Sequence, residues 1–265
     1  MLKPLSKLVL DVGNTRTKVG LFQGSRHMRW GTVANGDVET VAAFARGFHV
    51  AHVVLGSTAT PDPVLEVGLA QVAPVHVITG SSPTPLHSAY ATPQSLGADR
   101  SANAVAAVRR FPGRAVLVLD LGTCITYDLC LADGTYAGGG ISPGVRMRAQ
   151  AMHAYSARLP LVEFVEEPPL VGTTTVGSLA AGIHHGVLGE LVWYLRQFRG
   201  QHPHLAVVLT GGDAPRFVRG LESGIFALPL LTLEGSHALL VHHRSQRTGY
   251  LAPAAPAGDG PGPTG

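Results

Sequence analysis

Two short turns hold the residues of this chain that are best suited to chemistry. Each starts at an aspartate, Asp11 or Asp120, which ends an apolar run and precedes a glycine and then a threonine. Glycine allows a close approach of the backbone to a ligand, and the N–H groups of such a turn can surround phosphate oxygens. The carboxylate can hold Mg²⁺, and Lys18 follows the first turn, where it could neutralise phosphate charge. One such turn is typical of an ordinary hairpin, whereas two copies favour a repeated phosphate loop.

A third turn, Gly211-Gly212, follows the apolar run 206–209 and precedes a helical segment. Bare glycine backbone at this point would let a flat adenine ring lie against the chain. Taken alone, the turn is more typical of a plain connection between a strand and a helix. The interpretation of this turn as part of a nucleotide site therefore depends on the presence of the two phosphate loops.

The hydrophobic pattern predicts the elements that must position these turns. Strands are predicted at 7–12, 17–22, 28–33, 52–57, 75–79, 115–121, 124–131, 136–141 and 206–209. Helices are predicted at 38–48, 64–70, 98–111, 145–156, 175–199, 215–220 and 235–244, and 81–95 is predicted to be a loop.

The repeat of a strand, an Asp-x-Gly turn, a hairpin, a third strand and helices predicts the fold class. We expect an α/β protein made of two duplicated lobes with a cleft between them. The lobes are predicted at 1–112, with the first phosphate loop, and 113–251, with the second. The Pro-, Gly- and Ala-rich segment 252–265 is predicted to be a flexible tail.

Composition narrows the class of protein. The chain has 265 residues, 45% of them hydrophobic, and its net charge of +3 is not gathered in a basic run. Nucleic acid is therefore not an expected partner. No His or Cys cluster has zinc spacing, and Cys124 and Cys130 fit reduced thiols in a core. No segment has the length of a signal peptide or a membrane span, so we expect a soluble, cytoplasmic protein without a membrane partner.

The three turns together resemble the actin and sugar-kinase superfamily, in which two ribonuclease H-like lobes enclose ATP. Further motifs resemble the type III pantothenate kinases in particular. They are, in family order, Asp11–Lys18, Leu96-Gly-Ala-Asp-Arg100, Asp120–Thr123 with Thr126 and Asp128, Gly138–Gly144, Leu159-Pro160, and Gly172–Thr175 followed by Gly182. The resemblance implies phosphorylation of pantothenate to 4′-phosphopantothenate by ATP with Mg²⁺, the first step of coenzyme A synthesis. It also implies a homodimer.

The resemblance assigns a role to each motif. Asp99 is the implied general base, and pantothenate would contact Tyr90, Gly97, Ala98, Arg100 and Thr175. ATP would contact Asp11, Val12, Gly13, Asn14, Thr15, Arg16, Thr17, Lys18, Thr123, Gly211 and Gly212. Asp120 would bind a monovalent cation, K⁺ or NH₄⁺, and Asp11 is a candidate for Mg²⁺.

Several alternatives stay open at this point. Asp99 could cap a helix with Arg100 solvated, and Tyr90 could be a packed loop aromatic. The apolar face of the helix at 175–199 could belong to a dimer interface or to the core, and either Thr173, Thr174 or Thr175 could meet the substrate. A non-catalytic nucleotide-binding regulatory protein of the same fold is the alternative function, and a sugar or acetate kinase is a further one.

Overall fold

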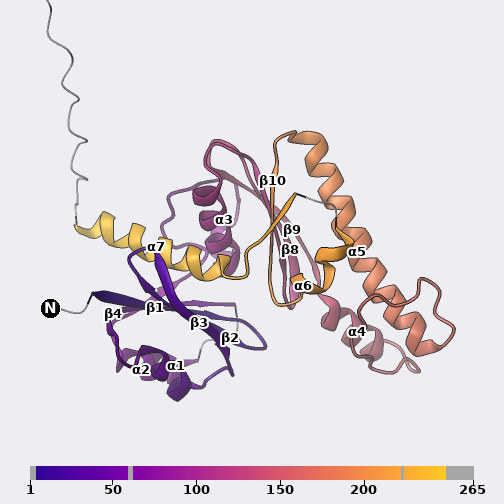
Figure 1. Ribbon diagram of the computed structural model, residues 1–265, viewed down its shortest axis with the longest axis horizontal. Coiled ribbons are helices and arrows are strands. Elements are labelled where there is room, and N and C mark those ends of the chain that lie inside the picture. Colours follow the sequence, from indigo (N-terminus) through magenta and orange to yellow (C-terminus); the bar gives the residue numbers. More distant parts are fainter. Residues whose placement is uncertain (1–3, 59–61, 222–223, 249–265) are drawn as a thin grey trace, which may run out of the picture.

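The computed structural model describes residues 4–58, 62–221 and 224–248 (Figure 1). The strands are β1 (Leu5–Val12), β2 (Thr17–Gln23), β3 (Arg26–Val33), β4 (His49–Ser57), β5 (Val75–Ile78), β6 (His87–Ser88), β7 (Val116–Leu121), β8 (Cys124–Cys130), β9 (Thr135–Pro143), β10 (Ala206–Thr210) and β11 (Ile225–Ala227). The helices are α1 (Val38–Ala45), α2 (Pro63–Ala70), α3 (Ala98–Arg110), α4 (Val145–Ala154), α5 (Thr175–Gln201), α6 (Ala214–Phe217) and α7 (Leu231–Thr248), with 3₁₀ turns at Pro93–Ser95 and Val218–Gly220.

Two mixed sheets repeat one topology, as the duplicated sequence predicts. The first sheet has the order β3-β2-β1-β4-β5, and the second has β9-β8-β7-β10-β11 with β6 added beyond β9. In each sheet the strand that ends in the motif aspartate lies at the centre, between an antiparallel and a parallel neighbour. The predicted α/β fold with two duplicated lobes is confirmed.

The same register places the two aspartates at equivalent points. Asp11 pairs with Lys18 across the β1–β2 hairpin, and Asp120 pairs with Thr126 across the β7–β8 hairpin. On the parallel side, Asp120 pairs with Thr210 of β10. Each aspartate thus lies at the carboxyl end of a central strand, where sheets of this kind bind ligands.

The molecule is built in five layers (Figure 1). Helices α1 and α2 cover the outer face of the first sheet, where Leu8 and Leu10 meet Val41 and Leu65. Helices α4, α5 and α6 cover the outer face of the second sheet in a large core cluster. The middle layer, between the two sheets, consists of α3 and α7.

Helices α3 and α7 bind the two sheets together. α3 turns Ala102 and Val105 toward the first sheet, and Ala106 and Ala107 toward the second. α7 follows the last strand of the second sheet, yet it packs on the inner face of the first. At their crossing the helices touch so closely that a side chain on Gly235 would collide with the backbone of Ala102.

The main differences from the predicted elements are the start of α7 and two short strands at the edges of the second sheet. α7 begins at Leu231, four residues before the predicted start, because Gly235 marks a helix crossing and not a helix end. β6 and β11 were not predicted, since their two and three residues are too short for a periodic pattern. The predicted tail at 252–265 lies outside the described residues. Within the described residues, no helix is both long and apolar enough to cross a membrane.

Candidate active site

The first turn is an open loop of four residues, 13–16, between β1 and β2. The N–H of Gly13 donates to the carbonyl of Arg16 at 3.1 Å, while Asn14, Thr15 and Arg16 are exposed. Asn35 supports the loop at its first residue, because its Nδ2 donates to the Gly13 carbonyl at 2.8 Å. In turn, Thr17 Oγ1 donates to Asn35 Oδ1 at 2.8 Å. The loop is fixed at its base and leaves its tip free for a ligand.

The second turn is tighter and consists of Gly122 and Thr123. The N–H of Gly122 donates to the Cys124 carbonyl at 3.0 Å. Gly144, at the start of α4, donates its N–H to the Thr123 carbonyl at 3.0 Å and lies so close that a side chain there would collide with Gly122. Thr123 remains exposed.

The two glycines of the third turn have different surroundings. Gly211 has a φ of +96°, and a side chain on it would collide with the backbone of Leu121 at the end of β7. Gly212 faces open space, with nothing within 4 Å of an added Cβ. Chain geometry alone therefore requires glycine at position 211 and not at 212.

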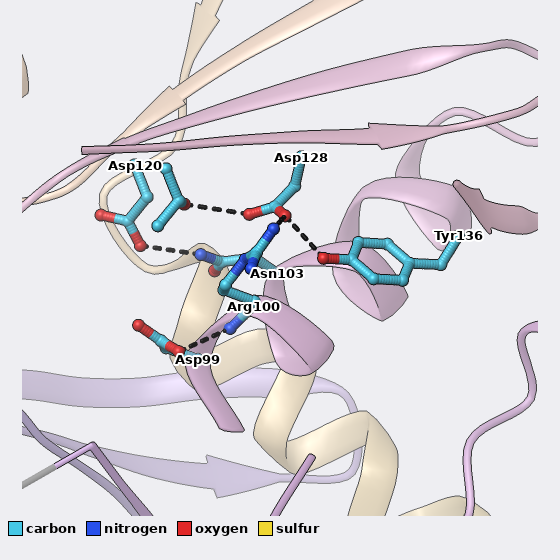
Figure 2. A network of polar contacts seen from close by, with 7 residues as sticks. Asp99, Arg100, Asn103, Asp120, Asp128 and Tyr136 are labelled. Carbon is cyan, nitrogen blue, oxygen red and sulfur yellow. Dashed lines mark hydrogen bonds and ion pairs between the residues drawn. The ribbon is translucent and has the colours of Figure 1, made fainter. Parts of the chain in front are cut away.

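Asp99 and Arg100 lie in the first turn of α3 (Figure 2). Gly97 is the N-cap residue and makes no side-chain cap. Asp99 is half-buried, and its Oδ1 accepts the N–H of Arg100 at 2.8 Å. Arg100 is buried, with 5% of its surface exposed, so the alternative of a solvated arginine is wrong.

Asp128 on β8 holds the Arg100 guanidinium. Arg100 donates from Nε at 2.9 Å and from Nη2 at 2.6 Å to Asp128 Oδ1. Tyr136 OH donates to the same oxygen at 2.7 Å, and Thr126 Oγ1 donates to Oδ2 at 2.9 Å (Figure 2). The Tyr90 ring lies 5.6 Å from the guanidinium carbon. Asp128 thus fixes one edge of the Arg100 guanidinium, and the Tyr90 ring lies beside that guanidinium.

Asn103, one helical turn after Asp99, reaches the second phosphate loop. Its Nδ2 donates to Asp120 Oδ2 at 2.7 Å, and its Oδ1 accepts from Thr232 Oγ1 at 2.9 Å. Sequence reasoning missed Asn103, Thr232 and Asn35. A signal for Asn103 was present: it is one amide in an alanine-rich helix, on the face of Asp99 because the two are four residues apart.

The carboxylates of Asp11, Asp99 and Asp120 influence one another electrostatically. Burial raises the pKa of Asp11 to about 7, with Lys18 opposing the shift and Asp99 and Asp120 adding to it. Burial, and then Asp120, raises the pKa of Asp99 to about 6. Burial also raises the pKa of Asp120, against the lowering effects of Lys18 and Asn103. Lys18 therefore lowers the pKa of both aspartates, one from each turn.

This site offers few protein ligands to a metal ion. Among the described residues, no group of three or more His, Cys, Asp or Glu side chains could hold a metal. A Mg²⁺ ion on Asp11 would therefore take most of its ligands from phosphate oxygens and water, as Mg²⁺ commonly does. The ion would bind the ionised form of Asp11, so the raised pKa of this carboxyl means that a proton competes with Mg²⁺.

Thr175 is not close to the residues on α3. It begins α5, and Figure 1 shows this end of α5 at the side of the molecule away from α3. Thr174 is the N-cap residue, and its Oγ1 accepts the N–H of Gly177 at 3.0 Å. A cavity of about 620 Å³ opens here, lined by Met152, Leu159, Gly172, Thr173, Thr174, Thr175, Ser178, Leu179 and Gly182.

A family model described as type III pantothenate kinase matches residues 7–196 of this sequence. The chain belongs to this family. A type III pantothenate kinase from Bacteroides fragilis is 36% identical over 243 residues, which covers 90% of this chain and 99% of the relative. Another, from Christiangramia forsetii, is 35% identical over 241 residues, again covering 90% and 99%. The predicted family, enzyme class and reaction, phosphorylation of pantothenate by ATP for coenzyme A synthesis, are thereby confirmed.

Solved structures agree on the fold. A structure titled as a putative Baf family transcriptional activator from Campylobacter jejuni matches with a TM-score of 0.54 and 16% identity, covering 90% of this chain and 99% of that one. The component A of (R)-2-hydroxyglutaryl-CoA dehydratase from Acidaminococcus fermentans matches with a TM-score of 0.50 and 16% identity, covering 91% and 99%. At these identities the likeness shows the fold alone, so it gives no support to the predicted regulatory alternative.

Proposed function

We propose that Asp99 is the general base of a direct phosphoryl transfer from ATP to pantothenate. The primary hydroxyl oxygen of pantothenate attacks the γ-phosphorus, the bond to the β-γ bridging oxygen breaks, and ADP leaves. The hydroxyl proton passes to Asp99 and then to solvent. The observation that carries this proposal is the position of Asp99 at the start of α3, within electrostatic reach of both Asp11 and Asp120. Its pKa of about 6 leaves it ionised at neutral pH and still basic enough to accept a proton.

The first turn is proposed to bind the ATP phosphates. The residues concerned are Asp11, Val12, Gly13, Asn14, Thr15, Arg16, Thr17 and Lys18. The exposed backbone of 14–16 can donate N–H groups to phosphate oxygens, and the Lys18 ammonium offsets their charge. Mg²⁺ would be held by Asp11 together with the phosphates. Since phosphoryl transfer depends on positioning and charge neutralisation, these contacts supply most of what the reaction needs.

The second and third turns are proposed to complete the nucleotide site. Thr123 is exposed and can reach a phosphate, while Gly212 offers open backbone to the adenine ring. Gly211 serves by packing on Leu121, which brings the third turn against the end of β7. The cross-strand partner of Asp11 is the charged Lys18, whereas that of Asp120 is the neutral Thr126. A monovalent cation, K⁺ or NH₄⁺, is therefore proposed to neutralise the Asp120 carboxylate.

Pantothenate is proposed to bind along α3. Arg100 would meet its carboxylate or the transferred phosphoryl group, with Tyr90, Gly97 and Ala98 around it. Asp128 serves as the residue that positions Arg100, because it engages Nε and Nη2 and leaves the other edge of the guanidinium for substrate. The fixed planar guanidinium suits recognition of a carboxylate.

A homodimer is proposed because Thr175 and α3 lie apart in one chain. The segment before α5 exposes Tyr155, Leu161, Leu170 and Val171, and α5 itself exposes Val176 and Trp193. Several exposed large apolar side chains on one segment and the helix that follows it suggest an interface. The face of α5 that carries Leu179, Ile183, Val187, Leu191 and Leu195 belongs to the core, so the interface would use the opposite face. The cavity at Thr175 would then serve the α3 site of the other chain.

Two further predictions are kept as proposals. The protein is proposed to act in the cytoplasm. The lobes are proposed to divide near residues 112 and 113, although α7 packs on the first sheet. Proteolysis that cuts first near residues 112 and 113 and leaves the two fragments associated would support that division.

A coupled assay of ADP release with pantothenate, with and without K⁺, tests the proposed function. Turnover should require pantothenate and rise with K⁺. Asp99→Asn should reduce turnover by at least about 100-fold, since it removes the base, while ATP binding measured by calorimetry stays within a few-fold of the wild type. The matched control is Asp133→Asn, which changes an exposed turn aspartate far from the site. Loss of ATP binding in Asp99→Asn would show that Asp99 is structural, and no turnover by folded wild-type protein would overturn the proposal.

A further inference from the structure

A chain of two hydrogen bonds, one buried and one partly buried, connects α7, α3 and β7. It runs from Thr232 Oγ1 to Asn103 Oδ1 at 2.9 Å, and from Asn103 Nδ2 to Asp120 Oδ2 at 2.7 Å. Asn103 is fully buried, and Thr232 is 3% exposed. The three residues come from distant parts of the sequence and meet in the middle layer between the sheets. Figure 2 shows Asn103 extending from α3 toward Asp120.

The two bonds give the Asn103 amide one orientation. An amide has a donor end and an acceptor end. Because an ionised carboxylate only accepts hydrogen bonds, the NH₂ group must face Asp120, and the Thr232 hydroxyl then donates to the amide oxygen. The reversed amide would place its oxygen against a carboxylate oxygen and leave buried groups unpaired, which is costly. Asp120 thus selects the orientation of the amide, and Thr232 holds the oxygen end of that amide without touching Asp120.

The same bonds set the direction of the Asp120 carboxylate. Asn103 engages Oδ2, so Oδ1 is the oxygen on the side of the second turn, where an added Cβ on Gly122 would lie 4.0 Å from it. On the adjacent strand Thr210 pairs with Asp120, and its buried Oγ1 has no hydrogen-bond partner among the described residues. An oriented carboxylate oxygen beside an unpartnered hydroxyl is a suitable environment for a cation or an ordered water.

We propose that Asn103 and Thr232 are positioning residues for the cation site at Asp120. The inference rests on the proposed function, because it takes the cation of that site to be K⁺ or NH₄⁺. Asn103 holds Oδ2 so that Oδ1 faces the cation, and Thr232 holds Asn103. Since Asp99 and Asn103 share one face of α3, and α7 packs on the first sheet, the arrangement fixes the cation site relative to the general base.

Thr232→Val and Asn103→Leu test this role, because each keeps the number and branching of the side-chain heavy atoms and removes polar groups. Two quantities are measured. The first is the K⁺ concentration that gives half-maximal turnover. The second is the rise in unfolding temperature when KCl replaces choline chloride at constant ionic strength. Thr232→Val should raise the half-maximal K⁺ concentration about fivefold, the factor that matches one hydrogen bond. Asn103→Leu should raise it at least about tenfold. At saturating K⁺, kcat should recover more fully in Thr232→Val than in Asn103→Leu.

Ser236→Ala is the matched control, since Ser236 is also a buried hydroxyl residue of α7, one turn after Thr232. It should leave the K⁺ requirement unchanged even if it lowers stability. If Thr232→Val and Asn103→Leu respond to K⁺ as Ser236→Ala does, the positioning role is wrong. The unfolding measurement separates this outcome from failure of the kinase proposal, because it needs no turnover. A wild type stabilised by K⁺ but inactive on pantothenate would contradict the function alone.

Discussion

The turn after β1 and the turn after β7 start from equivalent positions in the two sheets and meet different surroundings. Asp11 has an ammonium group, Lys18, opposite it in the hairpin, whereas Asp120 has the neutral Thr126. The first turn has four residues with an exposed tip, and the second has two residues pressed against Gly144. The duplicated topology thus carries two different electrostatic sites.

The difference suggests that the two duplicated turns bind different groups. An open loop with its own cation can accept the polyphosphate of ATP and its Mg²⁺. In the tight turn the Asp120 carboxylate accepts from the Asn103 amide, and Lys18 acts on it only from the other turn, so we expect a cation from solution to complete its neutralisation. The following predictions test this contrast, starting with the largest expected effect.

Removing the ammonium group should affect the first turn far more than a change at the equivalent position of the second. Lys18→Met is expected to lower kcat/KM for ATP by about 100-fold or more, because it removes a charge that stabilises the phosphates. Thr126→Val, at the matching register position, loses one hydrogen bond to Asp128 and should cost about fivefold at most. Steady-state kinetics at saturating pantothenate measures both. Equal losses would show that the charge contrast does not explain the two sites.

Adding a methyl group should distinguish the packed turn from the open one. Gly144→Ala forces a side chain into Gly122 and should lower the free energy of unfolding by about 2–3 kcal/mol. Gly13→Ala meets only the Arg16 carbonyl, 3.3 Å from the added Cβ, and should change stability by about 0.5 kcal/mol or less. Urea unfolding of both variants provides the measurement. A stable Gly144→Ala protein would contradict the close packing of the second turn.

The raised pKa of Asp11 predicts a pH dependence of stability. Its pKa is about 7 in the folded protein against an ordinary 3.8, so the folded state binds the proton more tightly than the unfolded state. Stability should therefore fall as pH rises from about 4 to 7, and Asp11→Asn should escape this loss and exceed the wild type by about 2 kcal/mol at pH 8. Asp133, whose pKa is lowered by the Thr135 N–H, should show the opposite sign at lower pH: its contribution is complete above the ordinary pKa of 3.8 and is lost as the pH falls below that value. Thermal unfolding from strongly acidic to mildly alkaline pH, without nucleotide, tests both.

The smallest effect is expected at the base of the first turn. Asn35→Ala removes the donor to the Gly13 carbonyl and should cost about 1 kcal/mol of stability. The KM for ATP should rise several-fold because the loop loses its support, while the K⁺ requirement, set at the second turn, stays constant. A change in the K⁺ requirement would indicate that the two turns are not independent.

Most of the fold could be predicted from the sequence because its signals are local. The strands before Asp11 and Asp120 are continuous apolar runs, and the repeat of the turns predicted the duplicated lobes. The site was predicted from sequence motifs, namely the three turns and the segment that contains Asp99. In contrast, Asn103 and Thr232 meet across 129 positions of sequence, and no local pattern indicates such a pair. The burial of Arg100 depends likewise on Asp128, which lies 28 residues away.

Helix α7 follows the second sheet in the sequence but packs on the first sheet, and this has a consequence for folding during synthesis. The inner face of the first sheet, with Val9, Val54 and Ile78, is covered by Leu233 and Leu239 of α7. Since synthesis runs from the N-terminus, this apolar face leaves the ribosome long before the helix that covers it. The first lobe should therefore depend on chaperones or remain loosely folded until nearly the whole chain has emerged, and a ribosome-bound chain arrested before Leu231 should be sensitive to protease in its first sheet.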